Sequence, residues 1–91
     1  MQLRWTSAAA EDLENIANYL FERTLENAAR LIREICDAPS AVKSFPNRGR
    51  AGKKEGTCEL VILSLPYIIV YHVRGDAVHI VRILHSSQDW P

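Results

Sequence analysis

Two kinds of hydrophobic spacing follow each other along this chain, and their order constrains the fold more than any other sequence feature. Between residues 13 and 20 the apolar residues recur at i, i+3, i+4 and i+7, the spacing of an amphipathic helix; they are Leu13, Ile16, Ala17 and Leu20. A second helical stripe runs from Ala28 to Ile35. Beyond residue 57, three runs rich in β-branched and aromatic residues (58–63, 67–73 and 77–84) are typical of strands.

Signals at the ends of the helical half predict where its elements begin and stop. Residues 2–6 alternate like a short first strand, and Ser7 then offers an N-cap for the first helix, which is expected to end near Arg23. The second helix should begin after Thr24. Pro39 predicts a break or kink, because its ring has no N–H for the i−4 bond. Whether residues 40–44 add another turn stays open.

The resulting order is β-α-α-β-β-β, with a tight turn expected at residues 74–76. Two helices that each present one apolar stripe are buried most economically on one face of an antiparallel sheet. We therefore expect an α+β fold in which a small twisted antiparallel sheet packs against a helical hairpin. At 91 residues, without repeats or linkers, the whole chain (1–91) is expected to form one domain.

The charge balance argues against an overall attraction to nucleic acid or membrane, because 11 basic residues face 11 acidic ones. Charge is nevertheless concentrated locally. The segment from residue 43 to residue 54 holds five basic residues and no acidic one: Lys43, Arg48, Arg50, Lys53 and Lys54. A nucleic-acid backbone or an acidic protein surface could bind there, and a solvated loop is the plainer interpretation.

Cysteine, histidine and hydropathy patterns indicate what the chain lacks. Cys36 and Cys58 match no metal-ligand spacing and are interpreted as buried free thiols. Three histidines without clustered carboxylates or thiols predict no metal site, with His72 and His79 expected on the solvent face of their strands. No cofactor is expected. The longest apolar run is too short for a membrane span and no signal sequence is evident, so a cytoplasmic location is expected.

Four sequence motifs, in order from residue 3 to the C-terminus, resemble those of the RelE/ParE toxins of type II toxin–antitoxin systems. They are Trp5-Thr6-Ser7-Ala8 with Asp12-Leu13, Ile16 and Tyr19-Leu20; Phe45-Pro46-Asn47-Arg48-Gly49-Arg50 with Gly52 and Gly56-Thr57; Glu59-Leu60-Val61 with Pro66-Tyr67-Ile68-Ile69-Val70-Tyr71; and Val78-His79-Ile80-Val81-Arg82-Ile83-Leu84-His85 with Gln88-Asp89-Trp90-Pro91. The resemblance implies the same α+β fold. It also implies a cognate antitoxin that holds the toxin inactive in a hetero-oligomer.

The family has two branches with different targets, and the resemblance leaves both open. The ParE branch inhibits DNA gyrase by binding it, whereas the RelE branch cleaves mRNA on the ribosome. Cleavage needs an acid or base and cations aimed at the phosphate, but residues 59–62 and 67–70 carry no positive charge. If this chain is a ribonuclease, Glu59 and His85 are its only plausible catalytic pair. The ParE-like interpretation, in which the chain is not an enzyme, is favoured.

A gyrase-binding toxin needs surface residues rather than a catalytic constellation. The candidates for binding a target or partner are Arg48, Arg50, Lys53, Lys54, Arg82 and Trp90. Arg82, in the last strand, is expected either to point to solvent or to pair with a carboxylate of antitoxin or target. Cys58 stands where many relatives carry arginine, which keeps a third hypothesis open: an inactive relative that survives as a binding module.

Overall fold

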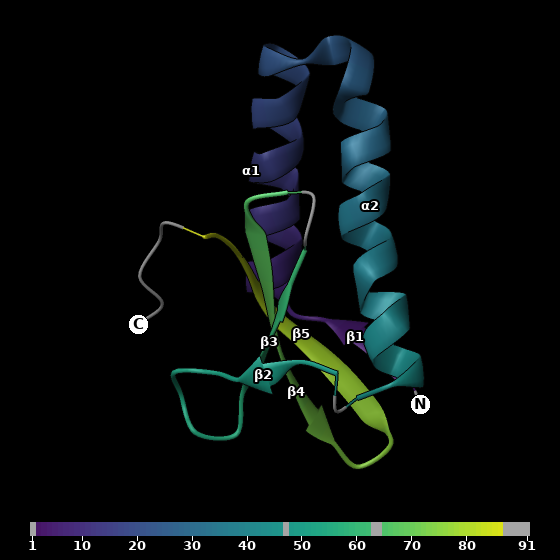
Figure 1. Ribbon diagram of the computed structural model, residues 1–91, viewed down its shortest axis with the longest axis vertical. Helices are drawn as coiled ribbons and strands as arrows, with labels where there is room; N and C mark the ends of the chain where they lie inside the picture. The colour runs from purple at the N-terminus through teal and green to yellow at the C-terminus, as the bar shows by residue number, and fades with distance from the viewer. Residues whose placement is uncertain (1, 47, 63–64, 87–91) are drawn as a thin grey trace.

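The computed structural model describes residues 2–46, 48–62 and 65–86, which form two helices and five strands (Figure 1). The elements are β1 (Gln2–Trp5), α1 (Ser7–Arg23), α2 (Leu25–Ser44), β2 (Arg50–Ala51), β3 (Cys58–Val61), β4 (Tyr67–Arg74) and β5 (Ala77–His85). The two helices stand side by side as a hairpin whose connection projects well beyond the sheet. The α+β class and the helical hairpin are as expected, with the two-residue β2 as an additional strand.

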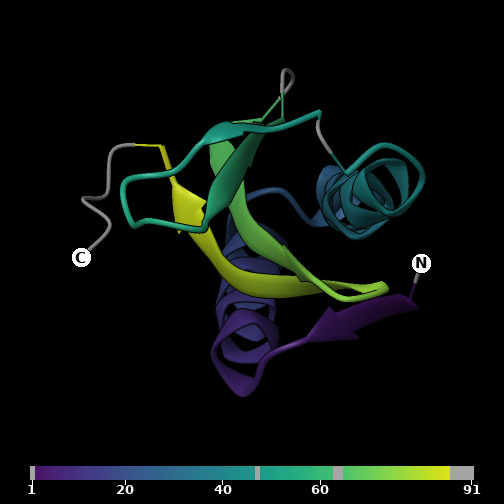
Figure 2. The ribbon, with the colours of Figure 1, turned by 90° about the horizontal axis from the view of Figure 1, so that it is seen from below.

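One sheet contains all five strands in the order β1-β5-β4-β3-β2. The pairs from β5 to β2 are antiparallel, as predicted, but β1 runs parallel to β5, so the sheet is mixed. A short turn forces its two strands to be antiparallel, whereas β1 and β5 are joined through the whole helical hairpin and are free to run in the same direction. Figure 2 shows the strong twist of the sheet.

The first helix is capped by Thr6 and not by Ser7, which corrects the sequence prediction. Thr6 has extended backbone geometry, with φ −74° and ψ 161°, and its hydroxyl accepts a hydrogen bond from the N–H of Ala9 at 3.1 Å. Ser7 is already the first residue of the helix. The predicted end at Arg23 is confirmed, since the backbone N–H of Thr24 closes the last turn on Leu20 at 2.8 Å.

The second helix continues through Pro39 to Ser44, so the expected break does not occur. Proline removes one backbone hydrogen bond, at a cost of about 3 kcal/mol. Pro39 and Val42 lie fully buried on the side of the helix that faces the core, and their burial offsets that cost. The open question about residues 40–44 is thereby answered: they form the last turn of α2.

The hydrophobic core lies between the helical hairpin and the sheet. Its fully buried members come from both layers, including Ile35 of α2, Ile69 and Tyr71 of β4, and Ile80 of β5. One expectation about the interior is wrong. Cys36 follows Ile35 on α2 and is exposed, while Cys58 is half-buried against the core, and both thiols are free. Neither α1 nor α2 has the length and apolar character that crossing a membrane requires.

Candidate functional site

The basic segment predicted from the sequence is anchored to the sheet by an ion pair between neighbouring strands. Arg50 of β2 lies opposite Glu59 of β3, and its Nε and Nη2 atoms each lie 3.2 Å from Glu59 Oε1. The Glu59 side chain is only 9% exposed and that of Arg50 is 62% exposed. A nearly buried carboxylate needs a counter-charge, so Arg50 covers Glu59 while it still presents part of its guanidinium to solvent.

Two hollows open beside this ion pair, and cations border both. One has a volume of about 300 Å³ and is lined by Arg48, Arg50, Glu59, Leu60 and Val61. The other has a volume of about 170 Å³ and is lined by Arg50, Lys53, Glu59, Ile68, Leu84, His85 and Ser86. We call the surface formed by Arg48, Arg50 and Lys53 around these hollows the basic edge. Glu59, the buried acid beside these cations, is already paired with Arg50, so the basic edge can attract an anionic group.

The loop that enters the basic edge is held by the hydroxyl of Tyr71. This hydroxyl donates to the carbonyl oxygen of Pro46 and accepts from the N–H of Gly49, both at 2.9 Å. Burial raises the pKa of Tyr71, so its hydroxyl remains a donor at neutral pH. A Cβ on Gly49 would overlap the Tyr71 hydroxyl and lie 2.9 Å from the carbonyl oxygen of Glu59. The motif that contains Pro46 and Gly49 therefore has a structural explanation.

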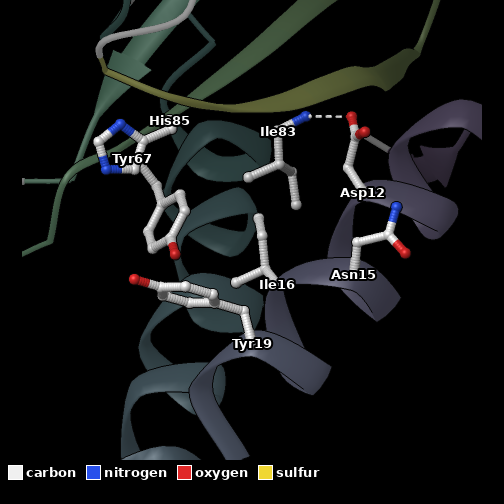
Figure 3. Close-up of a pocket in the computed structure, with 7 residues that line it drawn as sticks. All are labelled: Asp12, Asn15, Ile16, Tyr19, Tyr67, Ile83 and His85. Atoms are coloured by element: carbon white, nitrogen blue, oxygen red, sulfur yellow. Dashed lines mark hydrogen bonds between the residues drawn. The ribbon is translucent and has the colours of Figure 1, made fainter. Parts of the chain in front are cut away.

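Glu59 and His85 both border the smaller hollow, but their side chains start from opposite faces of the sheet. Glu59 lies opposite Val70, and His85 lies opposite Tyr67. Val70 and Tyr67 are three residues apart on one regular strand, so they face opposite ways. The His85 ring packs against Tyr67 on the helix side, with ring centroids 5.7 Å apart at 84° (Figure 3). The two side chains that a ribonuclease mechanism would combine therefore leave different faces of the sheet, although both reach the border of this hollow.

A third and larger hollow, about 410 Å³, lies on the helix side between α1 and the ends of β4 and β5 (Figure 3). It is lined by Asp12, Asn15, Ile16, Tyr19, Tyr67, Ile83 and His85. The hydroxyls of Tyr19 and Tyr67 point toward each other across its floor. Burial raises the pKa of Tyr67, and the nearby Tyr19 raises it further. Aromatic rings with a few polar groups beside them suit a ligand or a peptide segment that is itself amphipathic.

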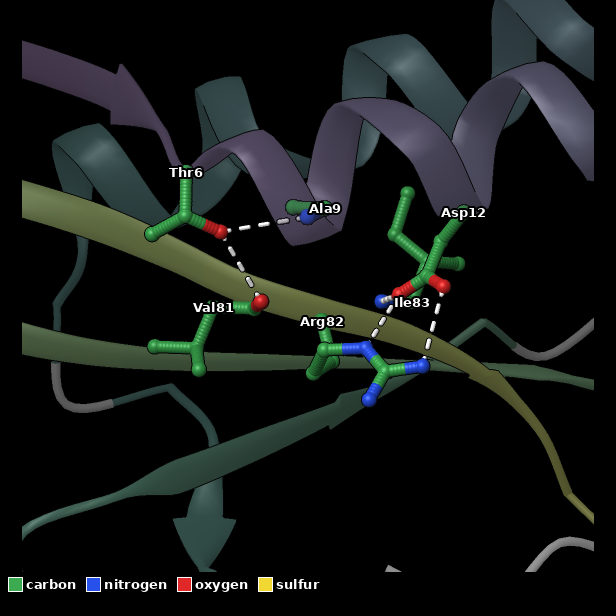
Figure 4. Close-up of polar contacts among 6 residues, drawn as sticks. All are labelled: Thr6, Ala9, Asp12, Val81, Arg82 and Ile83. Atoms are coloured by element: carbon green, nitrogen blue, oxygen red, sulfur yellow. Dashed lines mark hydrogen bonds and ion pairs between the residues drawn. The ribbon is translucent and has the colours of Figure 1, made fainter.

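Arg82 is bound within the chain by Asp12 of α1 (Figure 4). Its Nε and Nη2 atoms donate to the two carboxylate oxygens at 2.6 and 3.0 Å, and the N–H of Ile83 also donates to Asp12, at 2.9 Å. The hydrogen bond to Asp12 raises the pKa of Arg82 above its usual range. The expectation offered solvent or a carboxylate of another protein, whereas this carboxylate belongs to the same chain.

An irregularity in β5 allows α1 to dock on the edge of that strand. The register of β4 and β5 shifts after Val70, which leaves Val81 as an extra residue in β5. The Thr6 N–H donates to the carbonyl oxygen of Ile80 at 3.1 Å, and the Thr6 hydroxyl donates to that of Val81 at 3.0 Å (Figure 4). Thr6 and Asp12 together satisfy polar groups along β5 beyond the end of β1.

The other predicted site residues have different fates. Lys54 is exposed in the turn after β2, where its carbonyl oxygen accepts from the Thr57 hydroxyl at 2.6 Å. His72 and His79 are half-buried on the face of the sheet away from the core cluster. Trp90 lies outside the described residues. The sequence did not indicate the structural roles of Asp12 and Tyr71, although both lie in the recognised motifs, because their partners Arg82 and Pro46 are distant along the chain.

Known proteins of one family match this chain over almost its whole length. A family model described as the ParE toxin of the parDE type II toxin–antitoxin system matches residues 3–90. Y4kP of Sinorhizobium fredii, described as a toxin, is 37% identical over 90 residues, which cover 99% of this chain and 93% of that protein. Toxin RelE2 of Caulobacter vibrioides is 32% identical over 87 residues, which cover 96% and 97%.

Solved structures show the same architecture. A chain of the chromosomal ParDE toxin–antitoxin system from P. aeruginosa superposes with a TM-score of 0.86 at 25% identity, covering 93% of this chain and 95% of that one. A chain of the RelBE2 toxin–antitoxin complex from Mycobacterium tuberculosis gives a TM-score of 0.69 at 19% identity, covering 92% and 95%. The second likeness concerns the fold alone.

Proposed function

This chain belongs to the ParE toxin family of type II toxin–antitoxin systems, and on that premise we propose that it arrests growth by binding DNA gyrase. In this proposal the toxin acts in the cytoplasm without a cofactor and without chemistry of its own. A cognate antitoxin binds it and holds it inactive. The contribution of the toxin is therefore a surface, and the basic edge is the surface we assign to the target.

One observation carries the proposal. The side chains of Glu59 and His85, the candidate acid–base pair, emerge from opposite faces of the sheet, and Glu59 is engaged with Arg50. A general acid and a general base must reach the same substrate atoms. Here the two side chains leave different faces of the sheet and Glu59 already holds Arg50, whereas inhibition by binding needs no acid–base pair. The similarity to the chain of the ParDE system from P. aeruginosa, over 93% of this chain, also supports inhibition by binding.

The antitoxin is proposed to cover the opposite side of the molecule, along α1. The hollow of about 410 Å³ lies there, and three large apolar side chains near it or at the tip of the hairpin are exposed: Tyr19 at 50%, Phe21 at 47% and Leu25 at 73%. Exposed apolar surface of this kind marks an interaction site. An amphipathic segment of the antitoxin would fill the hollow and shield these residues.

The deciding experiment measures DNA supercoiling by purified gyrase in the presence of the purified chain. We expect inhibition that R48E and K53E each weaken by about tenfold or more, which corresponds to ~1.4 kcal/mol of binding free energy. R30E is the matched control, because Arg30 is an exposed arginine on α2, away from the basic edge. Unimpaired supercoiling with the wild-type chain would refute gyrase as the target.

A second candidate function, cleavage of ribosome-bound mRNA, keeps one observation in its favour. Arg50, Lys53, Glu59 and His85 all border a single hollow of about 170 Å³, where cations could hold a phosphate. Pulse-labelling of DNA and protein synthesis minutes after induction separates the two candidates. Gyrase inhibition predicts that DNA synthesis stops first and that E59Q and H85Q remain toxic. Arrest of protein synthesis, lost in both variants, would establish the ribonuclease instead.

A further inference from the structure

Two histidines that the proposed function does not use face each other across the hairpin of β4 and β5. His72 of β4 and His79 of β5 are direct partners in the register. Their ring centroids lie 4.9 Å apart with the ring planes inclined by 27°. A two-residue turn fixes this alignment, and Gly75 adopts the positive φ (62°) that the first position of a type II′ turn requires. Backbone geometry therefore places the two histidine side chains next to each other.

Strand alternation places both rings on the face of the sheet away from the helices. Their neighbours Tyr71, Val78 and Ile80 belong to the core cluster, so the histidines between them point the other way. Both histidines are half-buried and thus reachable from solvent. Within the described part of the chain, no carboxylate or hydroxyl forms a hydrogen bond with either ring. Their ring nitrogens are available to a ligand.

Burial, and the charged groups nearby, favour the neutral form of the His72 imidazole. His72 has a pKa lowered from 6.5, first by burial and then by His79 and Arg74. Arg4 of β1 is the register partner of His79, and its guanidinium donates to the Gln2 side chain at 2.7 Å. A neutral imidazole has one nitrogen lone pair free, which is the form that binds a metal ion.

We propose that His72 and His79 form a two-histidine site for a borderline divalent transition-metal ion such as Zn²⁺. Imidazole nitrogens bind Zn²⁺ at about 2.0–2.1 Å, so the centres of two rings on one ion lie roughly 5 Å apart. The observed centroid spacing of 4.9 Å matches that distance, and rotation of the two stacked rings about their side-chain torsions would turn one nitrogen of each toward the ion without moving the backbone. Water completes the coordination, because the described residues contain no third histidine, cysteine or carboxylate close enough to make a three-ligand cluster.

The chemistry of the site defines both its selectivity and its effect. Imidazole favours Zn²⁺, Ni²⁺ and Cu²⁺ over Mg²⁺ and Ca²⁺, which prefer oxygen ligands. An ion held by both strands links β4 to β5 in the folded state only, so binding stabilises the fold. Two ligands give an exchangeable site rather than a permanent structural one, since structural zinc sites use four protein ligands. The site does not depend on gyrase binding or on antitoxin binding.

The test uses the full chain without an affinity tag, stripped of metal with EDTA and then dialysed. Zinc chloride is expected to raise the melting temperature by a few degrees in a saturable way, and magnesium chloride to leave it unchanged. H72Q and H79Q should each abolish the rise. H85Q is the matched control, because it removes the third histidine and should keep the full rise. A zinc effect that survives H72Q, or that H85Q removes, would overturn the proposal.

A second measurement guards against variants that fold poorly. Imidazole ¹⁵N resonances of the wild-type chain should shift for His72 and His79 together, along one binding curve, as Zn²⁺ is added, while those of His85 stay in place. Shifts confined to His85, or separate curves for the two rings, would equally exclude the two-histidine site. This readout does not depend on any substitution.

Discussion

The Asp12 carboxylate of α1 binds the Arg82 side chain and the backbone N–H of Ile83 at the same time. Its two oxygens accept from Arg82 Nε and Nη2, and Oδ2 also accepts from Ile83. The Asp12 side chain is 14% exposed and that of Arg82 is 31% exposed. Seventy residues of sequence separate the partners, so this one carboxylate fixes the first helix to the edge of the last strand.

Removal of the Asp12 carboxylate should therefore destabilise the whole fold. D12A is expected to lower the free energy of unfolding by about 2–4 kcal/mol, because it leaves a partly buried guanidinium and a backbone N–H without their acceptor. D12N should lose less, about 1–2 kcal/mol, since its amide oxygen can still accept one of these bonds. Urea unfolding followed by circular dichroism measures both.

The matched control is the ion pair between Arg30 and Glu34 on α2. Its atoms approach to 3.2 Å, but the Arg30 side chain is 61% exposed. Exposed pairs four residues apart on a helix contribute about 0.3–0.5 kcal/mol. R30A should therefore change the unfolding free energy far less than D12A does. Equal losses in the two variants would mean that Asp12 has no special role at the strand edge.

Thr6 should matter more than its neighbour Ser7, although the sequence alone suggested the reverse. The Thr6 hydroxyl accepts from Ala9 and donates to Val81, whereas Ser7 is exposed in the first turn. T6A is expected to cost about 1–2 kcal/mol and S7A less than about 0.5 kcal/mol. Chemical denaturation of the two variants side by side decides the point, and a larger loss in S7A would contradict the assigned cap.

Local sequence patterns predicted the elements of this fold better than the contacts between them. The stripe from Leu13 to Leu20 and the end near Arg23 depend only on residues within one helix, and both were predicted. The choice of Thr6 over Ser7 depends on the carbonyl oxygen of Val81, which is distant in sequence. In the same way, α2 continues past Pro39 because Pro39 is buried, and local helix propensity gives no information about that burial.

The candidate site shows the same limit more clearly. The cluster of Arg48, Arg50 and Lys53 was visible as a run of basic residues without acidic neighbours. That Glu59 would pair with Arg50, and that His85 would emerge from the other face, follows from strand register. Register is set by which strands meet, and a shift of one residue reverses the face of every side chain. The sequence therefore identified these residues as candidates but could not show which of them lie close together in space.

The hydroxyl of Tyr71 is expected to stabilise the loop that carries the basic edge. Y71F removes the partner of the Pro46 carbonyl oxygen and of the Gly49 N–H, at a cost of about 1–3 kcal/mol. G49A should cost at least as much, because the new Cβ would overlap the Tyr71 hydroxyl. Y19F serves as the control, since Tyr19 is half-exposed. Thermal melts that show equal losses for Y19F and Y71F would remove this role.

Acid should weaken the fold through His72. Its pKa is lowered from 6.5, by burial first and by His79 and Arg74 second, so the unfolded chain takes up the proton more readily. The stability that His72 contributes is then complete above the unfolded pKa and declines as pH falls below it. The decline levels off below the folded pKa. Urea titrations in EDTA should show a flatter profile for H72Q, and an unchanged profile would exclude His72 as the source.

Arg50 should act both in stability and in target binding, and the two effects can be separated. R50Q leaves the Glu59 carboxylate, 9% exposed, without its cation, so it should lower the unfolding free energy by about 1 kcal/mol and also weaken gyrase inhibition. R48Q should weaken inhibition with little change in stability, because it leaves the ion pair between Arg50 and Glu59 intact. The double variant R50Q/E59Q removes the unpaired charge and should recover stability without recovering inhibition. If inhibition returned together with stability, Arg50 would serve the fold alone, and the basic edge would shrink to Arg48 and Lys53.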